Sequence, residues 1–185
     1  VQGLEPEIFE AALARLETAG ALELENGRIY PFGLCSEEKE IARGIANHMF
    51  DVDPPDSKDL ETRIRQTEFS LGIEYDVRQK DAIREFFSRS VMVLNGGPGT
   101  GKTTVVRAIL SIARSLYPDM VIQLAAPTGR AAKRLAALSD NDARTIHSLL
   151  RWNLEENTFA KGPSDLLECQ ILIIDESSMI DTHLF

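Results

Sequence analysis

The sequence feature that most restricts the fold is a glycine-rich stretch near the middle of the chain, GGPGTGKT at residues 96–103. It fits the pattern G-x-x-x-x-G-K-[ST], in which glycines allow a loop whose amide hydrogens point inward around phosphate oxygens. An apolar run, residues 91–94, comes directly before it, and four apolar residues follow at helical spacing: Val105, Ile109, Ile112 and Leu116. This order predicts a strand, a phosphate-binding loop and a helix.

The residue types in this loop match the chemistry of a nucleoside triphosphate. The amino end of the following helix adds partial positive charge, Lys102 would reach the β and γ phosphates, and the Thr103 hydroxyl would ligate Mg²⁺. A plain glycine turn is the alternative, but it leaves Lys102 and Thr103 unexplained. We therefore expect ATP and Mg²⁺ as cofactors, with the nucleotide held by Gly96, Gly97, Pro98, Gly99, Thr100, Gly101, Lys102, Thr103 and Thr104.

A second motif is an apolar run that ends in two carboxylates, ILIIDE at residues 171–176. Asp175 is placed to hold Mg²⁺ through its water shell, and Glu176 to orient and deprotonate an attacking water. Any buried strand must end in something polar, so this pattern alone is weak. Together with the upstream loop it indicates hydrolysis of a nucleoside triphosphate, with Glu176 and Lys102 as the catalytic candidates.

From Asp76 onward, short apolar runs alternate with segments of helical pattern. The runs are Val91–Leu94, Val121–Ala125 and Ile171–Ile174, and helices are expected over residues 77–89, from the glycine-rich loop to about Leu116, and after the second run. Such runs are typical of strands buried on both faces, so we expect an α/β fold with a parallel sheet. Ligands of such sheets bind beyond the carboxyl ends of the strands, where all three runs end in candidate motifs.

The first 75 residues have a different pattern of apolar and polar residues. Helical spacing over 5–19 is followed by alternating residues around Asn26-Gly27, which indicates a β-hairpin. We expect a winged-helix-like domain at residues 1–34, although a small packing unit fits the same pattern. Residues 35–75 are expected to form a helical connector: a helix over 36–50, a proline-rich linker at DVDPPDS, residues 51–57, and a charged helical segment over 58–72.

The net charge is distributed unevenly between the two parts of the chain, which matters for the partners that each part can bind. The chain has 20 Lys plus Arg and 29 Asp plus Glu, a formal charge of −9, which argues against DNA because phosphate affinity comes largely from basic residues. Residues 1–75 carry all of it, with 7 basic and 16 acidic residues, whereas residues 76–185 have 13 of each. We therefore expect the helix and hairpin within this acidic segment, residues 1–34, to dock on another domain rather than bind DNA directly, and residues 76–185 remain compatible with DNA.

The composition and the two ends of the sequence further restrict the class of protein. At 43% hydrophobic and 26% charged, the composition excludes a disordered tail and predicts a globular core. No apolar run approaches the roughly 20 residues that cross a bilayer, and the amino end lacks signal-peptide character, so we expect a cytoplasmic protein without a membrane partner. Because the sequence opens at Val1 and stops ten residues after Asp175, we expect a piece of a longer protein.

Four motifs together resemble those of one enzyme family. GGPGTGKTT at 96–104, APTGRAAKR at 126–134, TIHSLL at 145–150 and IDESSM at 174–179 resemble motif I, motif Ia, the following DNA-contacting motif and motif II of superfamily 1 helicases, most closely the RecD and TraA-like group. The resemblance implies a RecA-like P-loop ATPase domain at residues 76–185, incomplete and truncated after motif II. It also implies ATP-driven translocation along single-stranded DNA in the 5′-to-3′ direction, unwinding in DNA repair or recombination, and protein partners in such a complex.

The same resemblance implies roles for single residues. Gln79 would read adenine, although Asp76-Val77-Arg78-Gln79 also fits a helix capping box. Single-stranded DNA would be contacted by Pro127, Thr128, Arg130, Thr145 and His147.

Each DNA contact has a structural alternative. Arg130, Lys133 and Arg134 share one helix face, which also fits an ordinary solvated surface. Thr145 could cap a helix over 146–152, and His147 could be structural. Trp152 fits a core position better than stacking on a base.

Two other functional classes of P-loop protein remain possible from the sequence. A P-loop kinase shares the phosphate loop but has no need of IDESS or APTGRAAKR. A non-catalytic nucleotide switch predicts that Glu176→Gln leaves DNA-stimulated ATP hydrolysis unchanged, whereas a helicase predicts its near abolition. Motif III and a second RecA-like domain with arginine fingers are absent from these 185 residues, so we expect nucleotide binding with very slow hydrolysis.

Overall fold

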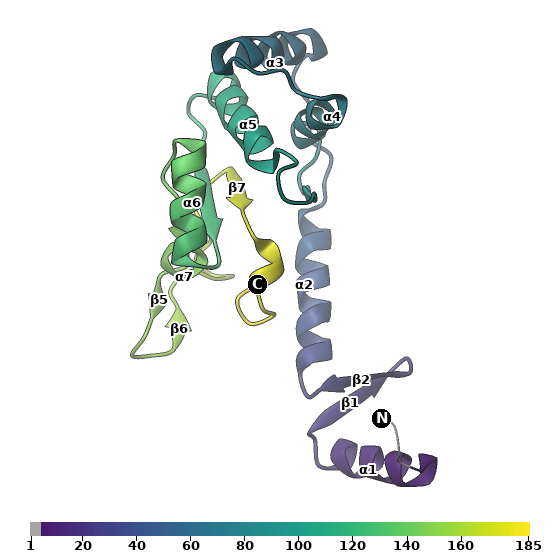
Figure 1. Ribbon diagram of the computed structural model, residues 1–185. Coiled ribbons are helices and arrows are strands. Elements are labelled where there is room, and N and C mark those ends of the chain that lie inside the picture. The colour runs from purple at the N-terminus through teal and green to yellow at the C-terminus, as the bar shows by residue number, and fades with distance from the viewer. Residues whose placement is uncertain (1–4) are drawn as a thin grey trace. The chain divides into compact units, whose positions relative to one another are not determined.

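The computed structural model describes residues 5–185 and divides into two compact units (Figure 1). The first unit contains the described residues up to Asn47, with residues 181–183 and 185, and the second contains residues 48–180 and 184. Residues 1–4 of the expected winged-helix-like domain lie outside the described residues. No helix within residues 5–185 is long and apolar enough to cross a membrane.

The first unit is a helix, a hairpin and a second helix. Helix α1, Pro6–Thr18, begins with proline, whose missing amide hydrogen costs nothing at the first helical position. Strands β1, Leu22–Glu25, and β2, Arg28–Pro31, pair antiparallel across Asn26 and Gly27, which have φ of 50° and 75° as a tight two-residue hairpin turn requires. The expected helix and hairpin are confirmed, and helix α2 follows as Leu34–His48.

The second unit opens with three helices around one apolar core. They are α3, Ser57–Leu71, α4, Val77–Phe86, and α5, Lys102–Leu116. Helix α3 is capped by Asp56, whose carboxylate accepts the Lys58 and Asp59 amides at 2.9 and 3.1 Å, and it ends at Gly72 with φ 64°. The core between them is built mainly of Leu60, Ile64, Tyr75, Ile83, Phe87, Val105, Ala108, Ile109, Ile112 and Ala113.

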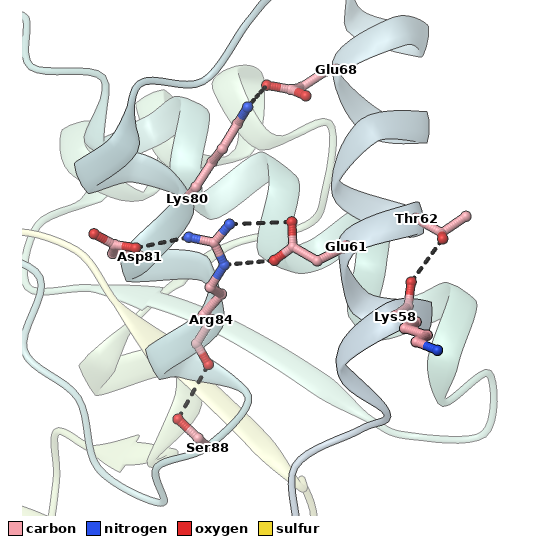
Figure 2. Close-up of polar contacts among 8 residues, drawn as sticks. All are labelled: Lys58, Glu61, Thr62, Glu68, Lys80, Asp81, Arg84 and Ser88. Carbon is pink, nitrogen blue, oxygen red and sulfur yellow. Dashed lines mark hydrogen bonds and ion pairs between the residues drawn. The ribbon is translucent and has the colours of Figure 1, made fainter.

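Ion pairs fasten α3 to α4 on the surface of this core (Figure 2). The Arg84 guanidinium donates to both carboxylate oxygens of Glu61, at 2.6 and 3.2 Å, and to Asp81 at 2.8 Å. Lys80 lies 2.9 Å from Glu68 in a second pair between these helices. The hydrogen bond from Arg84 lowers the pKa of Glu61, so the carboxylate stays charged into the acid range.

The sheet of the second unit is parallel, as expected. Strand β3, Ile122–Ala126, lies between β4, Arg144–Thr145, and β7, Ile171–Ile174. Ala126 pairs with Thr145, and Ala125 with Ile174, so the carboxyl ends of all three strands meet at one edge. Helix α6, Gly129–Ser139, packs against β3 and α5 through Ala131, Ala132 and Leu135 (Figure 1).

One strand prediction is wrong. Residues 91–94 form no strand, and Val93 is 84% exposed. No described strand lies beside this run to share its backbone hydrogen bonds, so its apolar composition alone does not make it a strand.

The segment after β4 also differs from expectation. The helix expected over 146–152 ends earlier, as α7, Ile146–Leu149, because the chain turns at Arg151, with φ 56°, into a small hairpin. That hairpin, β5, Trp152–Asn153, with β6, Thr158–Phe159, was not predicted. A short 3₁₀ helix, Ser177–Met179, follows β7.

Candidate nucleotide-binding site

The glycine-rich loop adopts a conformation that depends on its glycines. Gly99 and Gly101 have φ of 75° and 81°, a region that residues with a Cβ avoid. Thr100 folds over the loop, and its hydroxyl donates to the Gly97 carbonyl at 2.9 Å. A Cβ on Gly96 would lie 2.6 Å from that hydroxyl oxygen, so the close approach excludes a larger residue. The loop conformation fits the predicted phosphate cradle.

Lys102 is the first residue of α5, and its ammonium points back into the loop. It donates to the carbonyl oxygens of Gly96 and Gly97, the latter at 3.0 Å. The helix behind it is anchored by a buried face that includes Val105, Ile109 and Ile112. The lysine charge and the amino end of a 15-residue helix therefore lie together, which is the electrostatic environment that binds phosphate.

Gln79 links α4 to this loop. Its backbone amide donates to the Asp76 carboxylate at 2.8 Å, while its side-chain oxygen accepts the Asp76 amide at 3.0 Å, so the capping box is confirmed. Its side-chain nitrogen also donates to the Thr100 carbonyl at 3.3 Å, and it lies 2.3 Å from where a Cβ on Gly101 would stand. Gln79 lies beside the loop while it caps α4, so the capping role is compatible with the predicted contact with adenine, which stays a prediction.

Asp175 and Glu176 follow β7 in a constrained turn. The Asp175 amide donates to the Ala125 carbonyl at 3.0 Å, which extends the sheet by one residue, and its carboxylate accepts the Glu176 amide at 2.9 Å. Glu176 has φ 54° and ψ 38°, a left-handed conformation that costs a residue with a Cβ about 1 kcal/mol. Strained backbone of this kind concentrates at functional sites, and here it sets the direction of the candidate catalytic carboxylate.

The predicted magnesium ligands are chemically suitable but do not touch each other. The Thr103 hydroxyl and the Asp175 carboxylate are oxygen donors, as Mg²⁺ prefers. No cluster of three or more His, Cys, Asp or Glu side chains suitable for a metal occurs within residues 5–185. A few protein oxygens suffice where nucleotide phosphates supply the remaining ligands, so the residues fit Mg²⁺ bound together with ATP.

The phosphate loop and the acidic pair are not joined directly. Among the described residues, no hydrogen bond or ion pair links Lys102 or Thr103 to Asp175 or Glu176. Both lie in the second unit, but each is held by its own neighbours.

The predicted DNA contacts cluster at the carboxyl edge of the sheet. Pro127 and Thr128 follow β3, and Thr145 ends β4, beside Ala126. Both threonines cap helices: the Thr128 hydroxyl accepts the Ala131 amide at 3.2 Å, and the Thr145 hydroxyl accepts the Ser148 amide at 3.1 Å. The capping alternative is thus confirmed for Thr145, while DNA contact by these residues remains a prediction.

His147 sits in an aromatic cluster with Trp152 and Phe159. Its ring centroid lies 5.9 Å from that of Trp152 and 5.8 Å from that of Phe159, and the latter two are 4.5 Å apart. The cluster ties α7 to the β5–β6 hairpin, which supports the structural roles of His147 and Trp152. His147 is exposed, so its predicted DNA contact is sterically open.

One basic residue of α6 lies close to the candidate catalytic carboxylate, which the sequence did not predict. Arg130, Lys133 and Arg134 are exposed, as expected. The Arg134 guanidinium lies 3.9 Å from the Glu176 carboxylate. Sequence reasoning missed this approach because the two residues lie in different motifs, and neither helical periodicity nor strand order predicts which side chains meet across the sheet edge.

Comparisons with known proteins agree with the motifs. A family model described as an AAA domain matches residues 79–185. The ATP-dependent RecD2 DNA helicase of Deinococcus radiodurans is 31% identical over 168 residues, which cover 89% of this chain and 22% of that protein. The ATP-dependent DNA helicase dda of Enterobacteria phage T4 is 44% identical over 99 residues, 51% of this chain and 22% of that protein.

A third relative is the RecBCD enzyme subunit RecD of Buchnera aphidicola subsp. Schizaphis graminum. It is 34% identical over 173 residues, which cover 83% of this chain and 28% of that protein. The chain therefore spans between about a fifth and a third of the length of these curated relatives.

Proposed function

The chain belongs to the AAA-domain family, among the RecD-like proteins of helicase superfamily 1, and from this we propose that it forms the nucleotide-binding part of an ATP-dependent DNA helicase. The observation that carries the proposal is the folded phosphate loop, with Lys102 at the start of α5, in the same unit as a sheet edge that ends in Asp175 and Glu176. This arrangement supplies phosphate binding and a carboxylate base, which ATP hydrolysis requires.

In the proposed reaction, Lys102 exchanges the carbonyls of Gly96 and Gly97 for phosphate oxygens, and the loop amides hold the remaining charge. Glu176 orients a water toward the γ phosphate and accepts its proton. Thr103 and Asp175 would hold Mg²⁺, which would supply positive charge to neutralise the phosphates. Gln79, beside the loop, contacts the adenine.

The finer functional assignments are also proposals. We propose that single-stranded DNA runs along the carboxyl edge of the sheet at Pro127, Thr128, Arg130, Thr145 and His147, where amides, hydroxyls and basic side chains can bind phosphates. Translocation runs 5′ to 3′ and serves unwinding in DNA repair or recombination in the cytoplasm, together with other proteins of such a complex. The names of the relatives, DNA helicases and a subunit of a multisubunit enzyme, support these proposals.

The domain organisation is likewise proposed. A winged-helix-like domain at 1–34, a connector at 35–75 and the motor segment at 76–185 follow the changes in sequence pattern, and the described helix and hairpin of the first unit agree with the first of these. The compact units themselves divide between Asn47 and His48.

Unwinding tests this function most completely. The full-length protein should separate a short duplex that carries a 5′ single-stranded tail, in the presence of ATP and Mg²⁺, and should leave a duplex with only a 3′ tail intact. Unwinding of the 3′-tailed substrate alone would contradict the direction. Absence of unwinding and of DNA-stimulated ATP hydrolysis with every substrate would contradict the helicase assignment.

A further inference from the structure

The candidate catalytic carboxylate has a cationic neighbour on another element. The guanidinium of Arg134, on α6, lies 3.9 Å from the carboxylate of Glu176 after β7. Within the described part of the chain, this is the only ion pair that involves Glu176 or any of the basic side chains on the α6 face. The residue proposed to activate water is therefore also the residue that contacts the proposed DNA-binding helix.

The fold holds the backbone at both ends of this contact. Helix α6 is anchored through Ala131 and Ala132, each 4% exposed, which lie against Ala126, and these small residues bring the helix close to the end of β3. On the other side, the backbone of Glu176 is held by the bond to Asp175 and by a bond from the Met179 amide to the Glu176 carbonyl at 3.0 Å. The approach therefore results from packing.

The pair is suited to being exchanged. The Arg134 and Glu176 side chains are 68% and 36% exposed, and exposed ion pairs are held weakly. A guanidinium binds a phosphate with two parallel hydrogen bonds, so a DNA phosphate can displace a single carboxylate oxygen at 3.9 Å. Arg130, one helical turn earlier on the same face, is already a proposed DNA contact, so a strand bound there presents its neighbouring phosphate to Arg134.

We propose that Arg134 is a positioning residue that couples DNA binding to hydrolysis: without DNA it holds Glu176 away from the attacking water, and a DNA phosphate releases it. This inference rests on the proposed helicase function. Arg134 acts through Glu176 and does not touch the nucleotide in this mechanism. Its removal should therefore raise the DNA-free rate of hydrolysis, which is the opposite of what loss of an ordinary structural or DNA-binding residue does.

The test is ATP hydrolysis by full-length Arg134→Ala, with and without saturating single-stranded DNA. The expected result is a DNA-free kcat about threefold to fivefold above wild type, an unchanged KM for ATP and an unchanged kcat at saturating DNA, so the stimulation by DNA falls by the same factor. Arg134→Lys should restore a low DNA-free rate. Arg89→Ala, which removes an equally exposed arginine 3.0 Å from Glu85, is the matched control and should leave both rates unchanged.

A DNA-free kcat for Arg134→Ala at or below wild type would overturn the inference, as would an equal rise in Arg89→Ala. The proposed function fails in a different way: wild type shows no stimulation by DNA, or Glu176→Gln keeps the full rate. If wild type is stimulated and Glu176→Gln is inactive while Arg134→Ala behaves as wild type, only the role of Arg134 is wrong.

Discussion

Gln79 shows how one side chain can serve both a helix and a ligand site. Its carbonyl oxygen completes the capping box at Asp76, and its amide nitrogen reaches the phosphate loop at Thr100. The capping pattern was readable from residues three positions apart. The contact with the loop was not, because residues 79 and 100 are brought together only by the packing of α4 against α5.

The two roles of Gln79 can be separated by substitution. Glu at this position can still accept the Asp76 amide but cannot donate to Thr100 or to adenine. Gln79→Ala should lower the free energy of unfolding by about 0.5–1 kcal/mol and weaken ATP binding, whereas Gln79→Glu should weaken binding while losing less stability. Denaturant unfolding and titration with a fluorescent ATP analogue measure these effects. Wild-type nucleotide affinity in Gln79→Glu would contradict a contact with the base.

At the scale of elements, the α3–α4 contact should give the molecule a specific pH dependence (Figure 2). The hydrogen bond from Arg84 lowers the pKa of Glu61 below its ordinary value of 4.5. A depressed carboxyl pKa contributes stability that is complete above the ordinary value and is lost as the pH falls through the folded-state pKa.

Glu61→Gln should therefore lower the free energy of unfolding by about 0.5–1 kcal/mol at pH 7, because it removes the charged partner of Arg84. The difference from wild type should shrink as the pH falls below 4.5. Glu85→Gln, which removes the more exposed partner of Arg89 four residues along the chain, is the control and should have a smaller effect. Thermal unfolding followed across pH measures both variants, and a difference that grows in acid would contradict the pKa direction.

The core between the three helices includes the buried face of α5, the helix that follows the phosphate loop. Ile83 on α4 is fully buried, so Ile83→Ala should cost about 2–5 kcal/mol of unfolding free energy through lost burial and the cavity that remains. Val77→Ala, on the same helix but 74% exposed, should change stability by less than about 0.5 kcal/mol. Urea unfolding distinguishes them. Equal effects would contradict the packing of α4.

Element prediction from the sequence succeeded where a pattern was long or chemically specific. The hairpin at Asn26-Gly27, helix α5 and strands β3 and β7 follow from turn chemistry and periodicity. It failed at the apolar run 91–94, since composition does not supply a neighbouring strand, and at β4 and the β5–β6 hairpin, since two-residue strands leave no pattern. The site motifs were readable as local signatures, whereas contacts between motifs, such as Arg134 with Glu176, depend on tertiary packing.

In the molecule as a whole, nucleotide binding and nucleotide turnover should depend on different parts of the protein. The phosphate loop is formed by residues that contact each other, so the 185 residues as a separate polypeptide should bind ATP. Under the proposed helicase function, arginine fingers of a second motor domain would contribute about 10³ to 10⁵ in rate, so we expect this polypeptide to hydrolyse ATP more slowly than the full-length protein by a factor of that order. Single-turnover hydrolysis measures both rates. Equal DNA-stimulated rates for the 185-residue polypeptide and the full-length protein would contradict the prediction.

In the proposed function, Glu176 activates water for ATP hydrolysis coupled to DNA. The most direct test is Glu176→Gln in the full-length protein, with ATP affinity and the steady-state rate measured at saturating single-stranded DNA. The carboxamide keeps the size of the side chain but cannot accept the proton, so we predict wild-type ATP affinity and a loss of at least about 10²-fold in DNA-stimulated kcat. An unchanged kcat with intact binding would contradict the account and would assign the site to a nucleotide switch.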